Sequence, residues 1–331
     1  MPREEIETLE TSHVRFVLLG ALAVAAPFIL WNAFLRDLLV LFVIFSILAL
    51  SLNIVIGYMG QFCFGHQAFF GLGAYTTALL SIHTGVSPWL GVLAGVAVAG
   101  GLGCIIGLVA LRAMRGLYLA IVTYGIGVIM WLIFLNEYTI TGGPRGLYGI
   151  ARLAVPGLVF STEISLYFLA LAFLVFTVYF LTRWERSRFG RAVIAIRENE
   201  ELARSIGINS YIYYVMAFTL ATAVAGLAGC LYAHYLTIVN PYLFSTYYLF
   251  AMIIMVIVGG TGTLGGPILG SFIFTFGLRL LPTTKEIDLV IFGGILLAII
   301  ITMPRGAYPY LESLFTRLTA RRKQPEVGAS G

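Results

Sequence analysis

The chain has 331 residues, of which 60% are hydrophobic and 11% charged, and its mean hydropathy is +0.97. Soluble domains carry about 25% charged residues, so this composition excludes a water-soluble enzyme, a nucleic-acid-binding protein and a disordered chain. The net charge of +5 is typical of a membrane protein with basic cytoplasmic loops. We therefore expect an all-α polytopic membrane protein that is surrounded by the lipid bilayer.

Ten apolar runs approach the length of a membrane span, since a spanning helix needs about 20 mainly apolar residues. They are 16–34, 37–57, 62–82, 88–111, 116–135, 163–182, 211–235, 245–258, 264–281 and 287–303. The run 245–258 has only 14 residues, so it and the glycine-rich run 62–82 are candidates for broken or re-entrant segments. Ten spans divide into two halves of five with opposite orientation, which suggests an inverted repeat.

Positively charged residues predict the orientation, because Lys and Arg gather in cytoplasmic loops. With both termini inside, 15 of the 20 Lys and Arg residues lie on the cytoplasmic side. This arrangement gives a cytoplasmic N-terminal tail over 1–15, a transmembrane domain over 16–303 and a cytoplasmic C-terminal tail over 304–331. Within the domain, 136–162 is an outer loop and 183–210 is a long, charged cytoplasmic loop.

Two glycine-rich stretches, 57–75 and 259–270, interrupt the apolar pattern. Glycine either lets helices pack closely or lets the backbone unwind around a substrate. The first stretch opens the third span and the second follows the eighth, so we expect them to line a pathway of broken helices. Tight helix packing is the alternative. The residues assigned to the pathway are Gln61, Gly65, His66, Gln67, Gly71, Tyr75, Gly262 and Gly265.

The sequence shows none of the common catalytic or cofactor patterns. Its only lysines, Lys285 and Lys323, do not follow the glycine spacing of a phosphate-binding loop, so the chain itself is not expected to hydrolyse ATP. Its four histidines are scattered and suggest no metal cluster. We therefore assign no catalytic residue, metal or cofactor, and we do not expect an enzyme.

Within the charged loop, residues 192–206 are expected to form one short amphipathic helix that Gly207 ends. The sequence from Glu201 through Ala203 to Gly207 resembles the EAA motif of ABC importer permeases. In that family the motif forms a coupling helix, which docks in a groove of the ATP-binding subunit. The resemblance assigns ATPase coupling to these three residues, and Arg197 in the same helix is added. Glu201 would bond to the ATPase surface, and Ala203 would keep the contact face small. An ordinary solvated loop helix is the alternative.

Five segments resemble, in the same order, the LivM-type permeases of branched-chain amino acid ABC importers. They are GYMGQFCFGHQAFFGLGAY, TGGPRGLYGI, SRFGRAVIAIRENEELARSIGIN, AVAGLAGCLYAHY and VIVGGTGTLGGPILG. The resemblance covers most of residues 40–300. It implies a subunit of a bacterial or archaeal inner membrane that works with a second, LivH-like permease, two ATP-binding cassette subunits and a periplasmic or lipid-anchored amino-acid-binding protein.

The resemblance leaves the substrate open. Branched-chain or other neutral amino acids are expected first, and urea or short amides are the alternative within the family. A stand-alone channel or facilitator, with the glycine-rich stretches lining a passive pore, is the alternative from a different class of protein.

Overall fold

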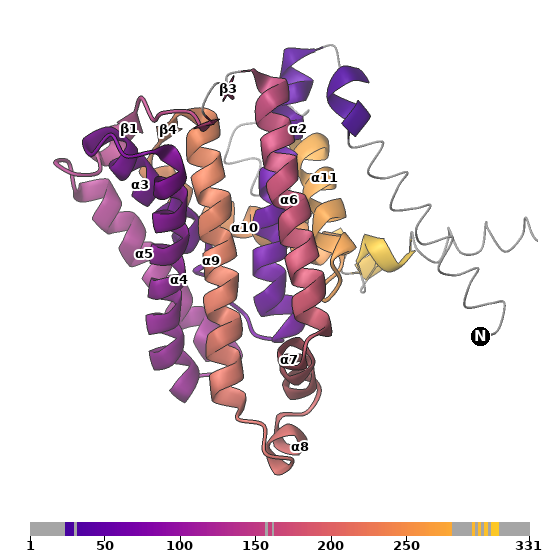
Figure 1. Ribbon diagram of the computed structural model, residues 1–331. Helices are drawn as coiled ribbons and strands as arrows, with labels where there is room; N and C mark the ends of the chain where they lie inside the picture. The colour runs from indigo at the N-terminus through magenta and orange to yellow at the C-terminus, as the bar shows by residue number, and fades with distance from the viewer. Residues whose placement is uncertain are drawn as a thin grey trace, which may run out of the picture.

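The computed structural model describes residues 24–29, 32–155, 158–160, 162–279, 293–294, 297–298, 301–303 and 306–310. Its long helices run roughly parallel to one another (Figure 1). The short strands lie at one end of this bundle, which we call the strand end. The helices α7 and α8 lie at the opposite end, which we call the α8 end (Figure 1).

Five helices among the described residues are long and apolar enough to cross a membrane. They are α2 (Ala33–Asn53) with the π-helical turn η1 (Ile54–Tyr58), α4 (Pro88–Ala113), α5 (Leu117–Asn136), α6 (Glu163–Arg186) and α9 (Ser210–Leu236). Each coincides with a run expected from hydropathy. Three more expected runs coincide with α3 (His66–His83), α10 (Thr246–Gly259) and α11 (Gly265–Arg279).

The remaining two expected spans, 16–34 and 287–303, lie largely outside the described residues, as do the two tails. The count of ten spans and the inverted repeat therefore stay predictions. The start of the third span is corrected, because residues 59–65 are not helical and α3 begins only at His66. Gly60 has a φ of +66°, a left-handed conformation that commonly terminates a helix.

The core of the bundle is built around α2, α3 and α9. In the most apolar part of α2, 89% of the residues are buried, and this helix packs against α6, α9, α10 and α11. Glycines bring α9 close to α3. A Cβ atom on Gly229 would lie 1.9 Å from the Phe70 carbonyl oxygen, and one on Gly73 would lie 2.3 Å from that of Gly226. Small residues allow such close helix packing in membranes.

The loop predicted over 136–162 covers the strand end. It contains the 3-10 turn η2 (Gly143–Arg145) and the strands β1 (Leu147–Tyr148), β2 (Ala154–Val155) and β3 (Leu158–Val159). β2 pairs with β3, and β1 pairs antiparallel with β4 (Ile238–Val239). The Trp89 indole in α4 donates to the Ala154 carbonyl oxygen at 2.7 Å, which fastens the loop to the bundle.

The chain enters α10 through an irregular segment that turns back into the bundle. After α9 it forms β4 and the 3-10 turn η3 (Pro241–Phe244) before α10 begins. His234 near the end of α9 lies beside Thr77, whereas Phe244 lies beside Gly71, more than one helical turn deeper along α3. α10 has 14 residues, so the expected short eighth segment is confirmed in length.

Candidate functional site

The predicted loop 183–210 contains two short helices beyond the end of α6. α7 spans Arg188–Glu198 and α8 spans Glu200–Ser205. The expected single helix over 192–206 is wrong, because Asn199 has an extended backbone and its side chain accepts a hydrogen bond from the Leu202 N–H at 2.9 Å. Asparagine favours the start of a new helix in this way. Gly207 has a φ of +88° and ends the helical segment, as expected.

α8 lies at the tip of the α8 end (Figure 1), and exposed apolar side chains lie on it and directly after it. The side chains of Leu202 in α8 and of Ile206, which directly follows the helix, are 63% and 71% exposed. We call these two residues the α8 apolar face. Glu201 is also exposed. Ala203 is 3% exposed and lies against the rest of the chain, so the expectation that it belongs to the contact face is corrected.

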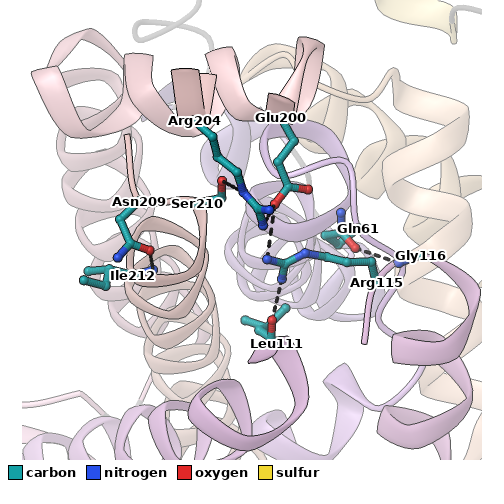
Figure 2. A network of polar contacts seen from close by, with 9 residues as sticks. All are labelled: Gln61, Leu111, Arg115, Gly116, Glu200, Arg204, Asn209, Ser210 and Ile212. Atoms are coloured by element: carbon teal, nitrogen blue, oxygen red, sulfur yellow. Dashed lines mark hydrogen bonds and ion pairs between the residues drawn. The ribbon is translucent and has the colours of Figure 1, made fainter. Parts of the chain in front are cut away.

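Glu200 at the start of α8 connects the loop to the turn between α4 and α5 (Figure 2). Its Oε1 atom accepts a bond from Arg204 Nη2 at 2.7 Å and another from Arg115 Nη2 at 3.4 Å. In the same turn, the Gly116 N–H donates to Gln61 Oε1 at 2.8 Å. Side chains therefore link α8 and the first glycine-rich stretch to the start of α5.

Arg197 in α7 connects the loop to both glycine-rich stretches. Its guanidinium donates to the Gly57 carbonyl oxygen, and a Cβ atom on Gly262 would lie 3.3 Å from its Nη1 atom. Asn53 is buried at the end of α2, where it donates to the Thr263 carbonyl oxygen at 2.8 Å and accepts from the Gly262 N–H at 2.9 Å. The two stretches thus meet at the α8 end, where Arg197 contacts both.

The contact between the two stretches leaves no room for a side chain at Gly57. A Cβ atom there would lie 2.2 Å from Asn53 Oδ1 and 2.4 Å from the Gly262 nitrogen. We expect Gly57→Ala to force these segments apart and to lower the free energy of unfolding by about 1–3 kcal/mol, the usual cost of overpacking. Thermal unfolding of the purified protein in detergent measures this loss.

Gly101→Ala is the matched control, because Gly101 is also helical and no described atom lies within 4 Å of a Cβ atom there. Alanine at such a position is expected to be neutral or to stabilise the helix by up to about 1 kcal/mol. Equal melting temperatures for the two variants would contradict the tight contact at Gly57.

The structure divides the expected pathway residues between two places. At the α8 end lie Gln61, Gly262 and Gly265, which are partly exposed, and beside or on α3 lie Gly65, His66, Gln67, Gly71 and Tyr75, which are buried. Cβ atoms on Gly65 and Gly71 would lie 2.0 Å from the Thr123 carbonyl oxygen and 2.6 Å from the Phe244 ring. The contacts of these two glycines agree with the packing alternative.

The sequence patterns do not identify Asn53, Arg115, Glu200, Leu202 or Ile206 as site residues. Asn53 could be identified from the sequence, because a polar side chain in an apolar span usually has a partner or a function. Leu202 and Ile206 could be identified too, as large apolar residues in a charged stretch. Arg115 and Glu200 could not, because their ion pair depends on a fold that joins residues 85 positions apart.

Comparison with known proteins identifies the family. The family model described as "Branched-chain amino acid transport system / permease component" matches residues 34–300. The chain belongs to this permease family. It is 33% identical over 316 residues to the high-affinity branched-chain amino acid transport system permease protein LivM of Escherichia coli, a match that covers 88% of this chain and 74% of that protein.

Two further relatives extend the comparison. The permease protein LivH of the same transport system in Escherichia coli is 28% identical over 297 residues, covering 79% of this chain and 90% of the relative. The probable branched-chain amino acid transport permease protein LivM of Methanocaldococcus jannaschii is 25% identical over 320 residues, covering 82% and 92%. No solved structure matches the chain significantly. The resemblance to LivM-type permeases is thus confirmed, and the relatives are transport subunits.

Proposed function

We propose that this chain is a membrane-spanning permease subunit of an ATP-driven importer for branched-chain or other neutral, apolar amino acids. Its family supports a permease subunit of an ABC importer, and the relatives LivM and LivH are permeases of branched-chain amino acid transport. In this proposal the chain supplies the route through the bilayer, and partner subunits hydrolyse the ATP.

The observation that carries the proposal is the α8 apolar face and its connections. Leu202 and Ile206 are large apolar side chains that are 63% and 71% exposed on a charged loop, so docking of a partner there would remove apolar surface from water. The EAA-like motif implies that the occupant is an ATP-binding subunit. Arg197 and Glu200 join this face to the ends of α2 and α5, so a subunit docked there would hold two membrane helices.

These connections suggest how ATPase motion reaches the membrane. When two ATP-binding subunits close on each other, each would carry the helix docked on it. The ion pair between Glu200 and Arg115 would then move the start of α5, and Arg197 would move the contact between Gly57 and Gly262. Single ion pairs that are partly exposed contribute under about 1 kcal/mol each. We therefore propose that these side chains determine which helices move, and that they contribute little to the stability of the fold.

The proposal places the α8 end in the cytoplasm and both termini on the same side. The distribution of Lys and Arg supports this orientation. The assembly contains a second, LivH-like permease, two ATP-binding cassette subunits and a periplasmic or lipid-anchored amino-acid-binding protein, which would meet the strand end. The membrane is the inner membrane of a bacterium or an archaeon.

Uptake by the reconstituted complex tests the proposed function. The chain is co-expressed with its partner permease, ATP-binding subunits and binding protein, and the complex is placed in proteoliposomes. We expect labelled leucine, isoleucine and valine to accumulate under two conditions only. ATP must be present on the side of the membrane where the ATP-binding subunits lie, and the binding protein must be loaded with the amino acid. Equal uptake without ATP would indicate a passive channel. ATP-driven uptake of urea, but not of amino acids, would indicate an amide importer.

A further inference from the structure

One face of α3 lies against α5 and η3, and aromatic side chains fill the contact. The Tyr75 ring centre is 4.6 Å from that of Phe134 in α5 and 5.8 Å from that of Phe244 in η3, and the latter two rings are 4.6 Å apart. Two turns nearer the α8 end, a Cβ atom on Gly127 in α5 would lie 2.8 Å from the Gln67 Nε2 atom. We call this contact, from Gln67 to Tyr75, the α3–α5 seam.

Two polar atoms in the seam have no hydrogen-bond partner among the described residues. They are the Gln67 Oε1 atom and the Tyr75 hydroxyl, in side chains that are 1% and 0% exposed. Ser245, next to Phe244, occupies the N-cap of α10, yet its buried hydroxyl neither caps that helix nor has a described partner. Buried polar groups are usually paired, and an unpaired one needs an explanation. A ligand that binds here transiently would explain these groups, because it would supply the missing hydrogen-bond partners.

α5 is less enclosed by the bundle than α9, the helix against which α3 also packs. Only 22% of the residues in its most apolar part are buried, against 67% in α9. At its α8 end it begins after Arg115 and Gly116, which bond to Glu200 and Gln61. The helix that closes the seam therefore begins directly after the turn that Glu200 in α8 contacts.

We propose that the α3–α5 seam is a substrate-binding path that opens when α5 moves away from α3. This inference rests on the proposed function, and its ligand is an α-amino acid with an apolar side chain. The Tyr75 hydroxyl donates to the substrate carboxylate, and Gln67 Oε1 accepts from the ammonium group. Phe134 and Phe244 contact the apolar side chain.

The two polar groups contact the substrate in succession. Eight residues separate Gln67 from Tyr75, and an α-helix rises about 1.5 Å per residue, so they lie about 12 Å apart along α3. Tyr75 is nearer the strand end, so imported substrate meets it first, together with the two phenylalanines. Gln67 is nearer the α8 end and meets the substrate second.

Tyr75→Phe and Gln67→Met test the seam in the reconstituted complex, because each removes a polar group and keeps most of the volume. We expect each to lower the maximal rate of leucine uptake about tenfold, as loss of one hydrogen bond to a charged group would do. We also expect an unchanged or higher melting temperature, since each variant removes an unpaired buried polar atom. Stimulation of ATP hydrolysis by loaded binding protein should persist.

Tyr118→Phe is the matched control, because Tyr118 lies on α5 and is largely exposed. It should transport like the wild type. Wild-type uptake rates for Tyr75→Phe and Gln67→Met would overturn the proposed role of the seam. Reduced uptake accompanied by a lower melting temperature would overturn it too. Neither result would contradict the proposed function. Absence of ATP-driven amino-acid uptake by the wild-type complex would instead overturn the proposed function, and the seam with it.

Discussion

Replacement of Leu202 by glutamate is expected to detach the ATP-binding subunits from this chain. The side chain is 63% exposed, so a charged residue there costs the isolated chain little. In the complex, the carboxylate would have to be buried in an apolar contact without a partner. We expect at least about tenfold weaker association with the ATP-binding subunits, which corresponds to about 1.4 kcal/mol. Loss of leucine uptake should follow, and affinity co-purification measures the association.

Two controls separate docking from general damage. Leu202→Met keeps an apolar side chain of similar volume and should retain the ATP-binding subunits. Tyr148→Glu adds the same charge at an exposed position of the strand end, and should not change their co-purification. Retention of these subunits by Leu202→Glu at the wild-type level would remove the α8 apolar face from the interface.

Gly207→Val is expected to abolish uptake without unfolding the protein. Gly207 has a φ of +88°, a left-handed conformation that costs residues with a side chain about 1–2 kcal/mol. Apart from its two chain neighbours, no described residue has an atom within 4 Å of a Cβ atom there, so the cost is in the backbone and not in packing. The strain would be relieved by rotating α8 away from its place at the start of α9, and the apolar face would lose its orientation. Uptake and ATP hydrolysis by the same proteoliposomes measure the result.

Gly207→Asn distinguishes the effect of backbone strain from the effect of adding any side chain at this position. Asparagine is several-fold enriched among the side-chain-bearing residues with positive φ, whereas β-branched residues avoid it. We expect Gly207→Asn to keep most of the uptake. If Gly207→Val transports as well as Gly207→Asn does, the turn at Gly207 has no part in coupling.

The helices of the bundle are predictable from the sequence, because an apolar run of sufficient length has few alternatives to a membrane helix. α9 therefore matches the run 211–235 to within one residue at each end, and α2 with η1 covers the run 37–57 and begins four residues before it. The break at Asn199 is harder to predict, since residues 192–206 have the periodicity of one helix. The local bond from the Asn199 side chain to Leu202 N–H overrides that pattern.

The contacts of the site are predictable only in part. The EAA-like motif locates the loop that we propose to dock, but the buried side of α8 depends on how it packs against the bundle. For this reason Ala203 faces inward, contrary to expectation, whereas the neighbouring Leu202 is exposed. The glycine-rich stretches signal close contact, yet only the fold shows that Asn53 joins them.

Site-specific photo-cross-linking tests the docking of α8 on the ATP-binding subunit most directly. A photoreactive phenylalanine derivative replaces Leu202 in the assembled complex, and a matched probe replaces Tyr148 at the strand end. Both positions are exposed in the isolated chain. We predict that the probe at 202 forms an adduct with an ATP-binding subunit and that the probe at 148 does not. An ATP-binding subunit captured from 148, or none captured from 202, would contradict the account.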